Sequence, residues 1–501
     1  MVDSSRSVSQ RAAVSAGWII AWRVATRNIG LLSTLILVRL LQPADFGLVA
    51  LATGLIGSID ALSAVGVQDA LVRAPDLDRD MYDTGFGISV LRGALTALLV
   101  AAIAWPVGDF FSDSRLTIVM LALSAGTLIS AFENIGIVDF RRNLAFRKEF
   151  DMQLWSRVAG VITTIAVAAA WHSYWALIAG ILIYRVVRLL QSYSMSPYRP
   201  RIAFGAWRKL IGFSTWSWAQ TILYQIRARS DGIVIGRLMG PLQVGVFSIG
   251  LELGSLPTTE LVEPLGRALF PGFASLHNAA ESLEGMFLGA LGLGFLLVLP
   301  AGVGISMVAD PMVRLTLGDQ WLAAVPVVQI IGVSGVTAIY THACGTLLNA
   351  VGRPGVTFTL IALSTLVNLA ALVVLVWFFG LAGAAVALAI SNGLDVAGFL
   401  WVTLPRIDVS LRRLVTPMAR PTIATAAMVG VLWRLNMAWT PSVPGGALEY
   451  AEDAATRSAI GATCYGIVLA GSWFAAGRPD GAERFALAMV KSAWVRVRRW
   501  I

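Results

Sequence analysis

Charged side chains recur inside the long apolar stretches of this sequence, where an ionisable group is costly and usually has a ligand or a charged partner. Arg23 and Arg27 share one helical face of the first apolar stretch. A later stretch places Tyr224, Arg227 and Asp231 on one face, with the arginine and the aspartate spaced as an i,i+4 pair. These residue types predict a water-filled cleft between membrane helices that binds a charged ligand.

The most suitable ligand for such a cleft is a phosphate or pyrophosphate group, because the guanidinium fork makes bidentate contacts and stays charged. Aromatic rings beside the arginines can offer their faces to sugars. The candidate substrate-binding residues are therefore Arg23, Arg27, Arg92, Arg227, Trp18 and Tyr224. The candidate carboxylates for ion coupling, or for the walls of the cavity, are Asp60, Glu133, Asp231 and Glu252.

A purely structural interpretation stays open for several of these groups. Arg185 and Arg188 lie near one end of their stretch, and we expect them to extend along it to the membrane surface. Arg39 and Arg237 lie near the other membrane surface and are expected to act as anchors. The i,i+4 pair can neutralise itself, and tryptophans often serve only packing or the membrane interface.

Composition sets the class of protein. Of the 501 residues 57% are hydrophobic and 13% are charged, whereas soluble proteins are about 45–50% apolar and about 25% charged. The net charge of +9 does not indicate nucleic-acid binding, because the basic residues form short clusters between apolar stretches. Cys344 and Cys464 lie inside apolar segments, and with only three histidines neither a disulfide framework nor a zinc site is expected.

A membrane-spanning helix needs about 20 mostly apolar residues. That criterion predicts an all-α polytopic membrane protein with about fourteen transmembrane helices. We expect an N-terminal lobe of six helices, a C-terminal lobe of six helices, two additional helices and a basic cytoplasmic tail, over residues 1–206, 207–405, 406–476 and 477–501. Lys and Arg are concentrated in alternate loops, which places both termini in the cytoplasm.

The division into two lobes depends on an internal repeat. The segment "LVRLLQPADFG" is matched farther on by "VIGRLMGPLQVG" at an offset of 198 residues (237 − 39 = 198). The offset pairs Arg39 with Arg237, Pro43 with Pro241 and Gly47 with Gly245. Because both copies fall between an odd and an even span, the sequence predicts parallel repeats.

Signals of an enzyme are weak. The loop Pro75–Asp83 contains closely spaced aspartates, but it is too short and has no nucleotide-binding domain beside it. No Ser/His/Asp set, phosphate-cradling glycine loop or zinc spacing occurs. The sequence therefore favours a transporter over an enzyme, without a cofactor.

Four segments, in their order and spacing, carry a family resemblance: "LVRLLQPADFGLVALA", "ALVRAPDLDRDMYDTGF", "DFRRNLAFRKEF" and "LLNAVGRPGV". Together they resemble the Wzx-type polysaccharide flippases of the multidrug/oligosaccharidyl-lipid/polysaccharide (MOP) exporter superfamily. The resemblance implies movement of undecaprenyl-pyrophosphate-linked oligosaccharide repeat units to the periplasmic leaflet of the bacterial inner membrane by alternating access. Exopolysaccharide, capsule or O-antigen synthesis would use such a step.

The same resemblance implies that arginines of the first helix contact the pyrophosphate, and Arg23 and Arg27 match by placement. It leaves open coupling to a proton or sodium gradient. The partners it implies are the lipid-linked oligosaccharide, membrane lipids, a polysaccharide polymerase and a chain-length regulator, with no nucleic acid.

Three other functions stay open: a flippase for peptidoglycan lipid precursors, a multidrug antiporter of the same superfamily, and a membrane glycan polymerase. The many arginines disfavour a cationic drug. A polymerase would predict loss of chain extension without cytoplasmic accumulation of lipid-linked units.

Overall fold

The computed structural model divides into two compact units, residues 1–245 and residues 246–501. It describes residues 26–484 apart from 27, 31, 64–65, 75–76, 144, 211–214, 263–279, 408 and 480–481. Within these described residues the secondary structure is helical, without strands, and ten helices are long and apolar enough to cross a membrane. The prediction of an all-α polytopic membrane protein is confirmed. The number fourteen and the four predicted segment boundaries stay predictions.

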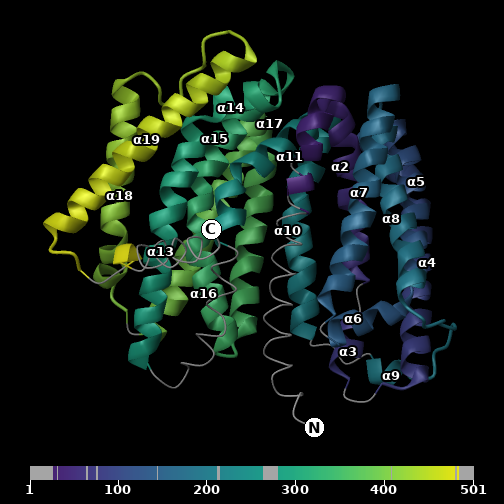
Figure 1. Cartoon of the computed structure of the whole chain (residues 1–501). Coiled ribbons are helices and arrows are strands. Elements are labelled where there is room, and N and C mark those ends of the chain that lie inside the picture. Colours follow the sequence, from purple (N-terminus) through teal and green to yellow (C-terminus); the bar gives the residue numbers. More distant parts are fainter. Residues whose placement is uncertain are drawn as a thin grey trace, which may run out of the picture. The chain divides into compact units, whose positions relative to one another are not determined.

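Unit 1 consists of long helices that run side by side (Figure 1). They are α2 (Pro43–Leu62), α4 (Arg79–Phe111), α5 (Ser114–Ala131), α7 (Phe146–Trp171), α8 (Trp175–Met195) and α10 (Thr215–Met239). An apolar helical segment, Asn28–Leu40, precedes them, and α11 (Pro241–Gly254) begins in unit 1. Four short elements complete it: α3 (Val67–Arg73), η1 (Ile135–Ile137), α6 (Val138–Arg142) and α9 (Trp207–Leu210). The α4–α5 and α7–α8 pairs make the most extensive contacts, as expected for antiparallel neighbours joined by short turns.

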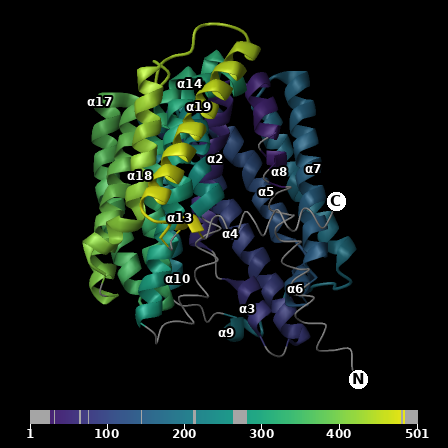
Figure 2. The same cartoon turned by 60° about the vertical axis from the view of Figure 1, so that its left-hand side comes forward.

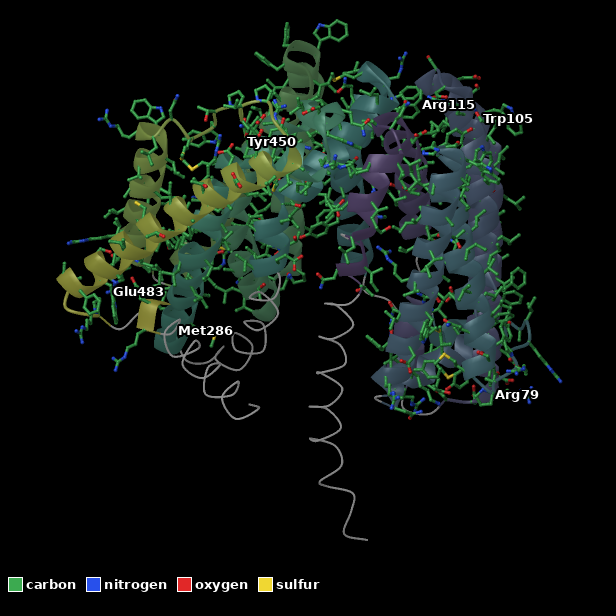
Figure 3. The ribbon with its side chains drawn as sticks, turned by 45° about the horizontal axis from the view of Figure 1, so that its top comes forward. Arg79, Trp105, Arg115, Met286, Tyr450 and Glu483 are labelled. Atoms are coloured by element: carbon green, nitrogen blue, oxygen red, sulfur yellow. The ribbon has the colours of Figure 1, made fainter. Side chains whose placement is uncertain are left out.

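The short helices α3, α6 and α9 gather at one end of unit 1, which we call the capped end (Figures 1 and 2). Asp83 Oδ1 ties the segment after α8 to α4 there, since it accepts hydrogen bonds from the Tyr198 hydroxyl at 2.7 Å and the Arg201 backbone N–H at 2.8 Å. Burial and the bond to Asp83 raise the pKa of Tyr198, so its hydroxyl stays a donor. Arg79 lies at the capped end and Arg115 at the opposite end (Figure 3), which we call the Arg115 end.

The two copies of the repeated segment meet within unit 1, where the stretch from Pro43 to Gly47 contacts the stretch from Pro241 to Gly245. Helix α2 begins at Pro43 and α11 at Pro241, so the helix starts keep the offset of 198 residues (241 − 43 = 198). A Cβ atom at Gly47 would lie 2.7 Å from the Gly245 nitrogen and would overlap the Pro241 carbonyl oxygen. In the same way, a Cβ atom at Gly245 would overlap the Pro43 carbonyl oxygen. The glycines are therefore required because two helix starts touch through their backbones.

Unit 2 is also built from helices (Figure 2). Its longer ones are α13 (Ala280–Met307), α14 (Ala309–Thr316), α15 (Val325–Ser334), α16 (Ala338–Ala350), α17 (Pro354–Thr403), α18 (Leu411–Arg434) and α19 (Ala447–Ala475). Its shorter elements are η2 (Thr258–Val262), η3 (Asp319–Ala324), η4 (Gly335–Thr337) and η5 (Leu404–Arg406). Helix α17 turns back at Gly380, whose φ of 58° suits only glycine. The Ser391 hydroxyl then donates to the Ser364 carbonyl at 3.3 Å across the two halves.

Candidate functional site

Unit 1 encloses a cavity of about 360 Å³, a volume within the range of small-ligand pockets. It lies between α2, α4, α5, α8 and the turn at residues 133–137. Its lining residues come from the parts of α2, α5 and α8 that approach the capped end (Figure 1). Five charged side chains line this space, which we call the polar cavity: Asp60, Arg92, Glu133, Arg185 and Arg188.

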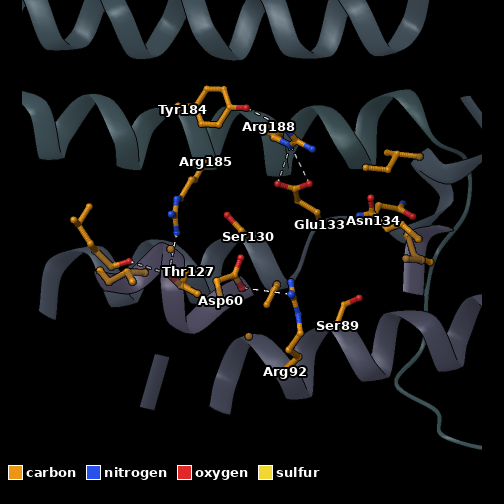
Figure 4. A pocket seen from close by; sticks show the side chains of 18 of the residues that line it. Asp60, Ser89, Arg92, Thr127, Ser130, Glu133, Asn134, Tyr184, Arg185 and Arg188 are labelled. Atoms are coloured by element: carbon orange, nitrogen blue, oxygen red, sulfur yellow. Dashed lines mark hydrogen bonds and ion pairs between the residues drawn. The ribbon is translucent and has the colours of Figure 1, made fainter. Parts of the chain in front are cut away.

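Helix α8 supplies the two most firmly held cations. The Arg188 guanidinium lies 3.0 Å from the Glu133 carboxylate, and it also donates to the Tyr184 hydroxyl at 3.1 Å. Both members of this ion pair are largely buried, with 23% and 14% of their side-chain surface exposed. Arg185 donates to the Thr127 hydroxyl at 3.1 Å. Tyr184, Arg185 and Arg188 all line the cavity, and Arg185 extends toward Thr127 and Arg188 toward Glu133 (Figure 4).

The third arginine of the polar cavity lies on the wall opposite α8. Arg92 of α4 lies 3.4 Å from Asp60 of α2, and this pair is more exposed, at 33% and 47%. Among the residues that the structure describes, the polar cavity thus contains three arginines and two carboxylates, which leaves one formal positive charge in excess. An anion with several oxygen acceptors would complete its charge balance.

The turn that presents Glu133 is fixed by its neighbour Asn134. The Asn134 backbone N–H donates to the Ser192 hydroxyl at 2.9 Å, and its side chain donates to the Tyr198 carbonyl at 2.6 Å. The side-chain oxygen of Asn134 also accepts from the Gly136 N–H at 2.9 Å. Because α5 ends at Ala131, these bonds hold the chain beyond the helix and aim Glu133 at α8.

Three of the ten predicted site residues line the polar cavity: Asp60, Arg92 and Glu133. Trp18, Arg23 and Arg27 lie outside the described residues. The substrate-binding and ion-coupling roles of all ten residues stay predictions.

The remaining four predicted site residues are not among those that line the polar cavity. Tyr224, Arg227 and Asp231 lie on α10, where the tyrosine is exposed and the aspartate is buried. Helix α10 packs on α2, with the Gln225 side chain donating to the Gly57 carbonyl at 3.2 Å. Glu252 is exposed and belongs to unit 2.

Sequence reasoning missed Arg185 and Arg188, which we expected to extend to the membrane surface. The structure instead turns both into the polar cavity, where one of them pairs with Glu133. Two signals were present in the sequence: the spacing of Tyr184, Arg185 and Arg188 on one face, and a carboxylate at the end of the fourth apolar stretch. Of the predicted anchors, Arg237 lies 5.3 Å from the ring centre of Phe110.

Comparison with known proteins identifies the family of this chain. The family model described as "Polysaccharide biosynthesis protein" matches residues 36–326, which is more than half of the chain. The lipopolysaccharide biosynthesis protein WzxC of Escherichia coli K12 is 23% identical over 74% of this chain and 76% of its own length. The succinoglycan biosynthesis transport protein ExoT of Rhizobium meliloti is 23% identical over 89% and 91%.

Two solved structures share the fold. The lipid II flippase MurJ in an inward closed conformation has a TM-score of 0.72 at 12% identity, covering 92% of this chain and 100% of that one. An inward-facing multidrug resistance MATE transporter of the MOP superfamily has a TM-score of 0.58 at 18% identity, covering 76% and 94%. With these helices and this family match, the chain belongs to the polysaccharide biosynthesis protein family.

Proposed function

We propose that this protein is a flippase that moves undecaprenyl-pyrophosphate-linked oligosaccharide repeat units from the cytoplasmic to the periplasmic leaflet by alternating access. The step serves the synthesis of exopolysaccharide, capsule or O-antigen and involves no covalent chemistry. Family membership and the names of WzxC and ExoT support the substrate class. The observation that carries the proposal is the excess of arginine in the polar cavity of a membrane protein.

The chemistry of the polar cavity suits this substrate. Arg185 and Arg188 are held in place by protein partners, so their remaining donors are preorganised for phosphate oxygens. Gln68, Ser89 and Ser130 line the same space, and their polar groups can bond sugar hydroxyls. A cationic drug would be repelled by the excess positive charge, which disfavours the antiporter alternative.

Further parts of the proposal concern placement in the membrane. The capped end carries Arg79, Arg141 and Arg142, and we assign it to the cytoplasmic side of a bacterial inner membrane, together with both termini.

Arg23 and Arg27 of the first apolar stretch are proposed to add to the pyrophosphate site. Asp60 and Glu133 are the proposed carboxylates if transport is coupled to a proton or sodium gradient. A polysaccharide polymerase and a chain-length regulator are the proposed partners.

A cellular assay of lipid-linked intermediates tests this function. Deleting the gene should stop polymer export and cause lipid-linked repeat units to accumulate on the inner leaflet, and the Arg27→Ala variant should do the same while still inserting. Repeat units that reach the outer leaflet but stay unextended would instead identify a glycan polymerase. Arrested peptidoglycan synthesis with normal polymer would identify the peptidoglycan-precursor flippase.

A further inference from the structure

A second hollow in unit 1 differs in character from the polar cavity. It has a volume of about 370 Å³ and lies between the segment Ser33–Leu37 and helices α2, α7 and α8. Most of its side chains are apolar, among them Leu37, Phe46, Val49, Val161, Leu177 and Ile181. We call it the apolar groove.

Of the described residues that line the apolar groove, one is charged. Arg157 lies near the middle of α7, a helix long enough to cross the membrane. Among the described residues it has no hydrogen bond and no ion pair, and its guanidinium lies against Gly30, where an added Cβ would be 3.1 Å from Nη2. The Arg157 side chain is exposed, and a membrane-embedded arginine without a carboxylate partner usually faces a water-filled cavity or a ligand.

The groove and the polar cavity are continuous in their lining. Thr53 of α2 and Tyr184 of α8 belong to both. The groove takes residues from the halves of α2 and α8 nearer the Arg115 end, whereas the cavity takes them from the halves nearer the capped end. From the capped end toward the Arg115 end, unit 1 therefore presents the arginine-rich polar cavity, then Arg157, then the apolar groove.

We propose that the apolar groove holds the isoprenoid units next to the pyrophosphate of the lipid-linked substrate, with Arg157 on the phosphate attached to the isoprenoid. This inference rests on the proposed function and extends it from the headgroup to the lipid. The order of glycan, pyrophosphate and isoprenoid in the substrate matches the order of polar cavity, Arg157 and apolar groove. A phospholipid would fill the groove but would leave the adjoining polar cavity without a ligand.

Binding to the purified full-length protein tests the inference, with farnesyl pyrophosphate and inorganic pyrophosphate as probes. Farnesyl pyrophosphate should bind at least about tenfold more tightly, because its chain removes apolar surface from water in the groove. Ala50→Phe, which fills the groove, should abolish this difference and leave the affinity for inorganic pyrophosphate unchanged.

The arginine is tested with three variants of α7. Arg157→Gln should weaken farnesyl pyrophosphate binding by about tenfold, the effect of losing one charge-assisted contact. Arg157→Lys keeps the charge and should retain part of the affinity. Arg147→Gln is the matched control, because this arginine has 74% of its side chain exposed at the start of α7; its affinity should not change.

Equal affinity for the two probes, or unchanged binding by Ala50→Phe and Arg157→Gln, would overturn the inference. So would displacement of farnesyl pyrophosphate by an equal concentration of phosphatidylglycerol, which would identify a site for bulk phospholipid. An export assay distinguishes a failure of the groove assignment from a failure of the proposed function. If Arg157→Gln and Ala50→Phe export normally while deletion of the gene stops export, only the groove assignment fails; normal export after deletion of the gene removes the proposed function itself.

Discussion

The polar cavity and the apolar groove adjoin within unit 1, yet they treat arginine differently. Arg188 in the cavity is bound by Glu133 and by the Tyr184 hydroxyl. Arg157 in the groove has no such partner among the described residues. In the cavity a protein carboxylate preorganises the arginine, whereas in the groove the proposed ligand would neutralise it. An amphipathic substrate would need both kinds of site.

The largest effect is expected from Arg188→Leu. The change removes a proposed phosphate contact and leaves Glu133 buried without its cation, which costs about 3–5 kcal/mol. Polymer export should fall to background, measured with the amount of protein in the membrane. Arg141→Leu is the matched control, because Arg141 forms an ion pair with Glu149 at 2.7 Å that is not part of the cavity; this variant should export normally.

A double variant separates folding from function. Arg188→Gln combined with Glu133→Gln removes both charges and therefore the penalty of an unpaired buried carboxylate. The double variant should insert at the wild-type level and still fail to export. Export by this variant would show that the pair is only structural.

A smaller effect is expected from the Arg92–Asp60 pair, which lies on the wall of the polar cavity opposite α8. Arg92→Gln should lower the affinity for inorganic pyrophosphate by about tenfold through loss of one charge-assisted contact. Asp60→Asn should raise that affinity, because it removes a negative charge 3.4 Å from Arg92. Neither change should reduce the amount of inserted protein, since half-exposed ion pairs contribute little stability. A weaker affinity in Asp60→Asn would contradict this charge balance.

Tyr184→Phe addresses one of the two residues that line both the cavity and the groove. The ring stays, but Arg188 loses a hydrogen-bond acceptor worth about 0.5–1.5 kcal/mol. Binding of inorganic pyrophosphate and of farnesyl pyrophosphate should each weaken by about two- to tenfold. A change confined to farnesyl pyrophosphate would place Tyr184 on the isoprenoid alone and would argue against its link to Arg188.

The smallest effect is expected at the Arg115 end, away from both sites. Asp113 caps α5 by accepting from the Arg115 N–H at 3.0 Å, and the hydrogen bond from the Arg115 side chain lowers the pKa of the Asp113 carboxyl. The ionised carboxylate therefore stabilises the fold above its unfolded pKa of about 3.9, and this stabilisation is lost as the pH falls through the lower folded value.

Asp113→Asn should accordingly lower the thermal midpoint at neutral pH by an amount worth up to about 1 kcal/mol. The difference from the wild type should shrink below about pH 4, and export should be unchanged. A midpoint difference that grows as the pH falls would have the wrong sign.

Much of the fold could be predicted because its signals are local. Apolar length identifies helices, and the Pro43/Gly47 and Pro241/Gly245 corners identify two equivalent helix starts. Asp60, Arg92 and Glu133 could be proposed for the site because a charge within or beside an apolar stretch is conspicuous. Their roles remain predictions.

The rest of the site depends on packing between distant segments. The direction of Arg188 is set by a carboxylate 55 residues earlier in the chain, and periodicity alone does not distinguish an inward arginine from one that extends to the surface. Arg157 was not proposed for the site, because the apolar groove that it lines exists only once α2, α7 and α8 lie together.

The central claim is that the polar cavity binds the headgroup of the lipid-linked oligosaccharide. A photoreactive amino acid at Ser130, which lines the cavity, tests it with radiolabelled lipid-linked repeat units in membranes. Trp105, exposed on α4 near the Arg115 end, is the control position (Figure 3). We predict strong labelling from position 130 that unlabelled substrate prevents, and little from position 105. Equal labelling at both positions, or none at position 130, would contradict the claim.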